Sequence, residues 1–163
     1  MVRRLARTAV LLGPLGLAAC GGGARLGPWT SLECAPYASA VTGMELRGNA
    51  AAWWTEATGR YERRRWPVPG SVLVFRAIGR MPAGHVAVVR RVVSPREILV
   101  DQANWVPHRI GRADPVVDVS ADNDWSAVRV WWAPVGALGI TTYPTAGFVG
   151  PGPDARVAAL RAR

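Results

Sequence analysis

The strongest constraint on the fold is a change in hydrophobic periodicity near residue 67. Before it, apolar residues recur at helical spacing over 33–46, and the run 49–58 (NAAAWWTEAT) opens on an Asn, a good helix N-cap. After it, short apolar runs alternate with turn residues, which predicts strands at 71–76, 84–93, 97–102, 116–119 and 128–132. Helices followed by an antiparallel meander predict an α+β fold, with N-terminal helices packed on an antiparallel β-sheet.

The first 20 residues have the features of an export signal. An arginine-rich start precedes the apolar run 8–17, which is shorter than the roughly 20 residues of a membrane span. The residues 17–20 (LAAC) resemble a bacterial lipobox, which implies cleavage before Cys20 and acylation of that cysteine. Two acyl chains would anchor the protein stably, and the glycines at 21–23 would begin a flexible tether. Ordinary cleavage that leaves Cys20 free is the alternative.

The net charge of +9 comes from 20 basic residues, all of them arginine, against 11 acidic ones. This balance suits an anionic polymer or a membrane surface. The arginines are scattered rather than gathered on one helix, and export would remove the chain from DNA, so we expect no nucleic-acid partner. Two histidines and one free thiol, widely separated, give no zinc motif, and no phosphate-binding glycine loop is present. We therefore predict no metal and no cofactor.

Cys34 and His85 are the candidate reactive pair. If Cys20 is acylated, Cys34 is the one thiol left, and an unpaired thiol outside the cytoplasm is a liability unless it is buried or used. A disulfide between the two cysteines remains possible if Cys20 is not acylated. Cys34 lies at a predicted helix start, where the helix dipole favours a thiolate, and His85 opens a predicted strand from which it can accept the proton.

A catalytic imidazole also needs a partner that fixes its tautomer. Asn104 lies just past the strand 97–102, and period-2 alternation places Gln102 and Asn104 on one face of that strand, with Asp101 on the other. We expect Asn104 to orient the imidazole, with Gln102 as the second candidate. The backbone N–H of Cys34 is the expected oxyanion donor.

Five segments, in order, resemble the CHAP family of cysteine- and histidine-dependent amidohydrolases and peptidases, which is related to the papain-like fold. The segments are 34–38 (CAPYA), 48–50 (GNA) with the tryptophans at 53 and 54, 69–75 (PGSVLVF), 84–89 (GHVAVV) and 102–105 (QANW). The resemblance implies that Cys34 is the nucleophile and His85 the general base. Many members carry Glu-x-Asn-aromatic after the His strand. Here Gln102 replaces the Glu, which leaves the third role open between Gln102 and Asn104.

The resemblance implies a CHAP catalytic domain over 33–135. It would follow a signal peptide over 1–19 and a tether over 20–32 that begins with lipidated Cys20, and it would precede an extension of unknown role over 136–163. The implied activity is hydrolysis of peptide or amide bonds of bacterial peptidoglycan through a thioester acyl-enzyme. We expect the protein in the cell envelope, lipid-anchored on the periplasmic side of a membrane, with the outer membrane favoured where there is one.

The aromatic residues Tyr37, Trp54 and Trp105 are the expected substrate contacts, since exposed rings in a cleft suit a glycan or peptide chain. An amidase acting on a smaller substrate is a second enzymatic interpretation, which export disfavours. A different class of protein is a non-hydrolytic wall-binding or scaffold lipoprotein that keeps the fold. The replacement at Gln102 favours this alternative, whereas retention of Cys34 and His85 favours an enzyme.

Overall fold

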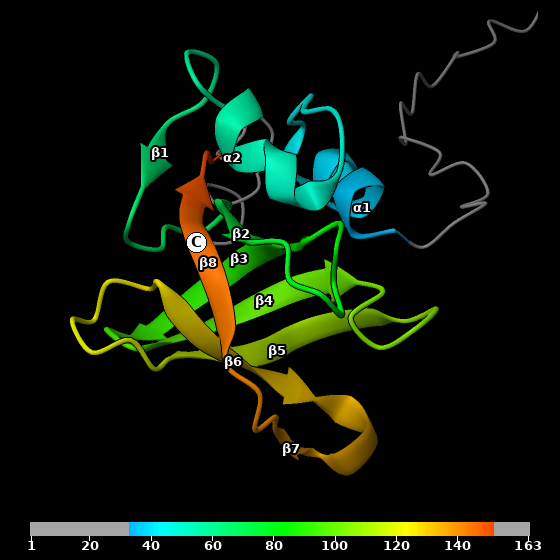
Figure 1. The fold of residues 1–163 in the computed structure, drawn as a ribbon, viewed down its shortest axis with the longest axis vertical. Helices are drawn as coiled ribbons and strands as arrows, with labels where there is room; N and C mark the ends of the chain where they lie inside the picture. Colours follow the sequence, from blue (N-terminus) through cyan, green and yellow to red (C-terminus); the bar gives the residue numbers. More distant parts are fainter. Residues whose placement is uncertain (1–32, 152–163) are drawn as a thin grey trace, which may run out of the picture.

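The computed structural model describes residues 33–151, so the expected signal peptide, lipidated Cys20 and tether lie outside the described residues. The fold is α+β, as predicted, with helical elements first and strands after them (Figure 1). The helical elements are α1 (Cys34–Thr42), the 3-10 turn η1 (Ala50–Ala52), α2 (Trp53–Glu56) and, later, the 3-10 turn η2 (Ala133–Val135). The strands are β1 (Arg63–Arg64), β2 (Val72–Phe75), β3 (His85–Ser94), β4 (Glu97–Ala103), β5 (Ile110–Asp118), β6 (Ala127–Trp132), β7 (Ala137–Leu138) and β8 (Tyr143–Val149).

The helix starts follow the local sequence signals. α1 begins at Cys34, as predicted, but it ends at Thr42 because Gly43 adopts a left-handed conformation (φ 68°) and its N–H donates to the Ser39 carbonyl. Asn49 caps η1, as predicted: its side-chain oxygen accepts a hydrogen bond from the Ala52 N–H at 3.0 Å. Within 33–151 no helix combines the length and apolar character that crossing a bilayer requires.

The sheet closes into a six-stranded antiparallel barrel. The strand order is β1-β8-β2-β3-β4-β5-β6-β7, and β8 also pairs with β6, so β2 to β6 and β8 form a ring. The predicted antiparallel pairing is confirmed, whereas closure of the sheet was not predicted. β8 closes it by pairing Val149 with Val72 of β2 and Tyr143 with Val128 of β6. The folded domain therefore extends through Val149, beyond the boundary expected at 135, and residues 152–163 lie outside the described residues.

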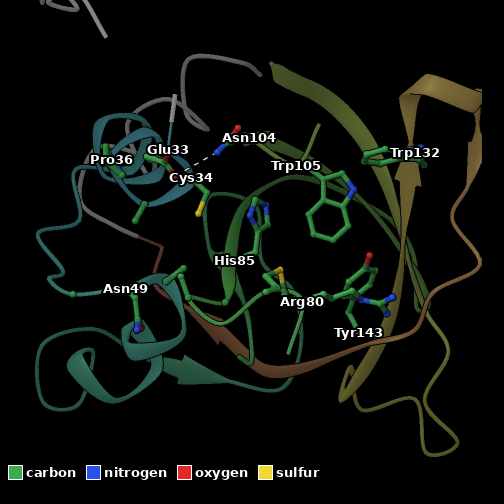
Figure 2. A pocket seen from close by; sticks show the side chains of 16 residues that line it. Glu33, Cys34, Pro36, Asn49, Arg80, His85, Asn104, Trp105, Trp132 and Tyr143 are labelled. Atoms are coloured by element: carbon green, nitrogen blue, oxygen red, sulfur yellow. Dashed lines mark hydrogen bonds between the residues drawn. The ribbon is translucent and has the colours of Figure 1, made fainter. Parts of the chain in front are cut away.

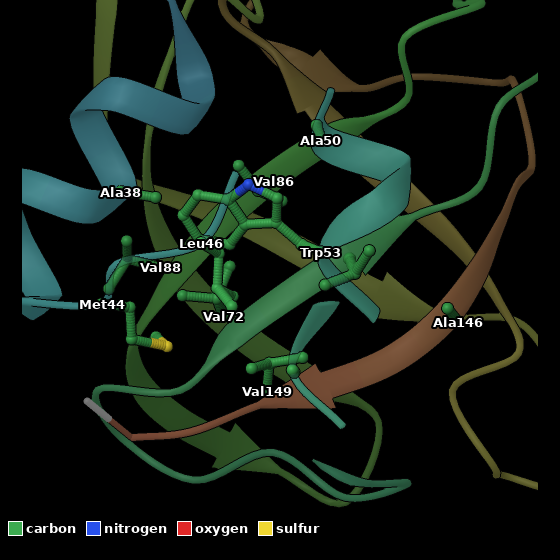
Figure 3. Close-up of a cluster of buried hydrophobic side chains, with 12 residues drawn as sticks. Ala38, Met44, Leu46, Ala50, Trp53, Val72, Val86, Val88, Ala146 and Val149 are labelled. Carbon is green, nitrogen blue, oxygen red and sulfur yellow. The ribbon is translucent and has the colours of Figure 1, made fainter. Parts of the chain in front are cut away.

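Two hydrophobic clusters lie on opposite faces of β2 and β3. Along β2, Val72 and Val74 face the helices, while Leu73 and Phe75 face the barrel interior, and all four are buried. The helix-side cluster centres on Trp53, which is fully buried (Figure 3). Because both faces of β2 are covered, its four residues are all apolar rather than alternating with polar ones. This packing holds α1 against β3 and β4 at the place where the candidate site forms.

Candidate active site

Cys34 is the first residue of α1 and His85 is the first residue of β3, so each reactive side chain lies at the start of a rigid element. Gly84 allows η1 to lie close to the start of β3. Its φ is +69°, and a Cβ there would lie 2.7 Å from both the Ala51 Cβ and the Phe75 carbonyl oxygen. The Ala51 N–H in turn donates to the Ala83 carbonyl at 2.9 Å. Glycine is therefore required before His85 for this close approach.

Both side chains face a cavity of about 600 Å³. Figure 2 shows the Cys34 sulfur and the His85 imidazole on its wall, with Trp105 beyond the imidazole. The remaining lining residues come from the start of α1, the segment before η1, the loop before β3, the segment that follows β4, and the strands β6 and β8. They include Glu33, Pro36, Asn49, Arg80, Met81, Asn104, Trp132 and Tyr143. The helical part and the barrel thus contribute opposite walls of one cavity.

The Cys34 thiol is partly buried, and burial raises its pKa above the ordinary value of 9.0. Backbone N–H groups of Val86 and Ala35 oppose this change by hydrogen bonding to the sulfur, and the Glu33 charge adds to it. The contact with Val86 places the sulfur beside the first residues of β3. At neutral pH the resting group is therefore the thiol, which needs a base in order to react.

His85 is buried, with 4% of its surface exposed. Its ring packs at 5.4 Å from Phe75 and 4.9 Å from Trp105, measured between ring centroids. Burial lowers the pKa of His85 to about 4, and the hydrogen bond that its ring donates to the Gln102 oxygen only partly opposes this effect. The imidazole is therefore neutral at pH 7 and able to accept a proton.

Gln102, and not Asn104, is the partner of the imidazole. The Gln102 Oε1 lies 3.0 Å from the His85 Nε2, and the Gln102 side chain is fully buried. This corrects the expected preference for Asn104. β4 ends at Ala103, and Asn104 adopts a left-handed conformation (φ 62°) that breaks the period-2 alternation.

The Asn104 amide is engaged elsewhere on the cavity rim. Its Nδ2 donates to the Glu33 carboxylate at 3.4 Å, and its Oδ1 accepts from the His108 N–H at 2.9 Å. Asp101 points to the other face of β4, as expected, where it contacts Arg90 at 3.4 Å. Asn104 therefore lines the cavity without contacting the imidazole.

Of the three expected substrate contacts, Trp105 alone lines the cavity. Tyr37 is buried in the core, and Trp54 packs on the helix-side cluster with the Arg63 guanidinium 5.0 Å from its ring centroid. Arg80 and Tyr143 are cavity residues that the sequence analysis did not identify. Tyr143 lies on β8, a strand that was not predicted, and the Arg80 guanidinium lies 5.4 Å from its ring centroid.

Within residues 33–151 no cluster of three or more His, Cys, Asp or Glu side chains has the arrangement to hold a metal ion.

These features define a class of protein: an α+β domain with a thiol at a helix start, beside an imidazole at the start of a barrel strand. The CHAP domain model matches residues 23–104, about half of the chain, and the chain belongs to this family. CHAP domains are typically cysteine- and histidine-dependent amidohydrolases or peptidases, and they often act on peptidoglycan. No curated protein is similar enough to the chain to count as a match.

Proposed function

We propose that the protein is a cysteine amidohydrolase or endopeptidase that hydrolyses peptide or amide bonds of bacterial peptidoglycan. The observation that carries the proposal is the placement of Cys34 and of a buried His85, which Gln102 holds, on the wall of the same 600 Å³ cavity. Membership of the CHAP family supports the reaction class.

In the first half of the reaction, Cys34 Sγ attacks the substrate carbonyl carbon. Gln102 occupies the Nε2 of His85, so the Nδ1 is the ring nitrogen that remains to take the thiol proton. The backbone N–H of Cys34, at the first position of α1, has no acceptor within the helix and can donate to the oxyanion. As the C–N bond breaks, the imidazolium gives its proton to the leaving amine, and a thioester remains on Cys34.

In the second half, water attacks the thioester carbonyl. The neutral His85 takes a proton from this water, and the carbon–sulfur bond breaks. The imidazolium returns the proton to the sulfur, which regenerates the thiol and releases a carboxylic acid. The net reaction is hydrolysis of one amide bond, with no cofactor consumed.

One charged group of the cavity, the Arg80 guanidinium, fits a substrate that carries carboxylates on a peptide chain. Arg80 lies on the cavity wall, and no acidic residue within 33–151 is within ion-pair distance of it. The rings of Trp105 and Tyr143, 4.9 Å apart, offer apolar surface beside this cation. Stem peptides of peptidoglycan combine free carboxylates with short apolar side chains, so they match this lining.

We further propose that the protein is exported and lipid-anchored in the cell envelope through acylated Cys20, as its lipobox-like segment implies. Growth of the producing bacterium with an alkyne-bearing fatty acid should label the wild-type chain and leave Cys20→Ala unlabelled. Equal labelling of both forms, or labelling of neither, would contradict the anchor.

The test of activity is digestion of purified peptidoglycan by the native protein beside Cys34→Ser. New amino groups and soluble fragments should appear with the native form alone, and mass spectrometry of the fragments identifies the bond. The alternative is a non-hydrolytic wall-binding lipoprotein, which the uncharged Gln102 beside His85 favours. Wall binding with an intact fold, but without release from walls of several chemotypes, would support that alternative.

A further inference from the structure

The hydrogen-bond chain of the site does not end at Gln102. The Gln102 Nε2 donates to the Asp114 carboxylate at 2.9 Å, and Asp114 lies in β5, beyond the segment that the CHAP model matches. We infer that Asp114 is a positioning residue for His85, which acts through Gln102 and supplies the negative charge that Gln102 lacks. This inference rests on the proposed hydrolytic function.

The local backbone is arranged to let this carboxylate reach Gln102. Across β4 and β5, Gln102 pairs with Gly111 and Val100 pairs with Asp114, so β5 carries one extra residue in a bulge between the two pairs. A Cβ at position 111 would overlap the Asp114 Oδ2. The Asp114 carboxylate therefore fills the space opposite Gln102 that a side chain at 111 would otherwise occupy.

The Asp114 carboxylate fixes the direction of both hydrogen bonds, from Gln102 to Asp114 and from His85 to Gln102. An ionised carboxylate only accepts hydrogen bonds, so the Gln102 group that faces Asp114 has to be its NH₂. The Gln102 oxygen then faces His85, and because this oxygen also only accepts, the His85 Nε2 carries the hydrogen. The unprotonated nitrogen is consequently Nδ1, the one needed to accept a proton from Cys34. Among the hydrogen bonds of the described residues, the one to Asp114 is what distinguishes the NH₂ end of the Gln102 amide from its oxygen end.

Asp114 is also the carboxylate placed to offset the imidazolium that forms during the reaction. Asp101 lies on the opposite face of β4 among arginines, and Glu33 is engaged by Asn104 at the cavity rim. No arginine within residues 33–151 is within ion-pair distance of Asp114, so no cation neutralises its charge. A charged acceptor two hydrogen bonds from His85 stabilises its protonated form, because the intervening Gln102 and the imidazole itself are buried.

The first test measures kcat, KM and the tautomer of His85 in full-length variants. Asp114→Ala should lower kcat about 10- to 100-fold and leave KM within about twofold. A decrease of this size is typical when a residue that orients a metal-bound histidine through a hydrogen bond is removed. Asp114→Asn keeps an acceptor oxygen but removes the charge, so it should lower kcat less than Asp114→Ala does. In ¹⁵N-histidine spectra, wild type should show one His85 tautomer with hydrogen on Nε2, and Asp114→Ala a mixture. The control is Asp122→Ala, which removes an exposed carboxylate elsewhere and should leave kcat, KM and the His85 tautomer unchanged.

The second test moves the charge. Gln102→Glu combined with Asp114→Asn puts a carboxylate directly on the imidazole and an amide behind it, and it should recover most of the activity that Asp114→Asn loses. Gln102→Glu alone should be less active than the pair, because two carboxylates then face each other.

The inference is overturned if Asp114→Asn and Asp114→Ala keep wild-type kcat and a single His85 tautomer. The tautomer measurement needs no substrate, so it decides the role of Asp114 even if the native protein hydrolyses no wall. If Asp114→Ala fails to fold, the nearly isosteric Asp114→Asn and the charge swap still decide the question: absence of rescue would refute the role of the charge.

Discussion

Acidification should destabilise this fold through His85. In the folded state burial lowers the pKa of His85 from 6.5 to about 4, so between these two values the unfolded chain binds a proton that the folded chain does not. Above about pH 7 the imidazole is neutral in both states, so His85 adds no pH dependence there. The free energy of unfolding falls as the pH decreases from 6.5 to 4. The difference between the two pKa values corresponds to about 3 kcal/mol in the free energy of unfolding. The protein should have lost nearly all of this stability when the pH reaches 4.

The assay compares wild type with His85→Gln, which cannot bind the proton. Urea unfolding of both proteins between about pH 7 and pH 4 gives the change in free energy of unfolding, and subtraction removes the shared effects of carboxylates. Wild type should lose about 3 kcal/mol more than the variant. An NMR titration of the imidazole gives the pKa directly, and since the chain has only two histidines, a His108→Gln variant assigns the signals.

Two results would refute this reasoning. Equal losses of stability in wild type and His85→Gln would show that burial does not perturb the imidazole. A His85 signal that titrates near 6.5 or above would point to a resting thiolate–imidazolium pair with Cys34, in which the thiolate stabilises the charged ring. Either outcome would replace the neutral pair from which the proposed proton transfer starts.

Three further predictions concern the supports of the site. Gly84→Ala should cost about 1–3 kcal/mol more than Gly59→Ala in urea unfolding, because both have positive φ but only the first Cβ overlaps its neighbours. Phe148→Ala in the buried core of β8 should cost about 3–5 kcal/mol, whereas Val135→Ala, 68% exposed, should cost little. Trp105→Ala should expose the imidazole and raise its pKa from about 4 toward 6.5, measured by NMR, and move the acidic limb of the pH–rate profile with it. An unmoved pKa would show that Trp105 does not exclude water from the ring.

The parts of the site that depend on local sequence could be predicted. Cys34 at a helix start and His85 at a strand start follow from the periodicity around each residue, and the structure places both as expected. Asn49 as a cap follows from its short side chain before a helical run. These features need no knowledge of which distant segments meet.

The parts that depend on strand pairing could not be predicted. Pro144 and Gly147 weaken the strand pattern of β8, so neither this strand nor the closure of the sheet that it makes could be predicted. Continued alternation along β4 predicts Asn104 beside the imidazole, but the left-handed conformation of Asn104 ends that alternation, and its amide contacts Glu33 and His108 instead. The contact of Gln102 with Asp114 depends on a bulge between two strands, and no local pattern indicates it.

The most direct test of the central claim is to trap the acyl-enzyme on Cys34. Peptidoglycan fragments are mixed with the native protein, the reaction is quenched in acid within the first turnovers, and the digested protein is mapped by mass spectrometry. We predict an acyl adduct on the peptide that contains Cys34, labile to hydroxylamine as a thioester is, and no adduct in Cys34→Ser. Hydrolysis without any adduct on Cys34, or full activity of Cys34→Ser, would contradict nucleophilic catalysis by this thiol.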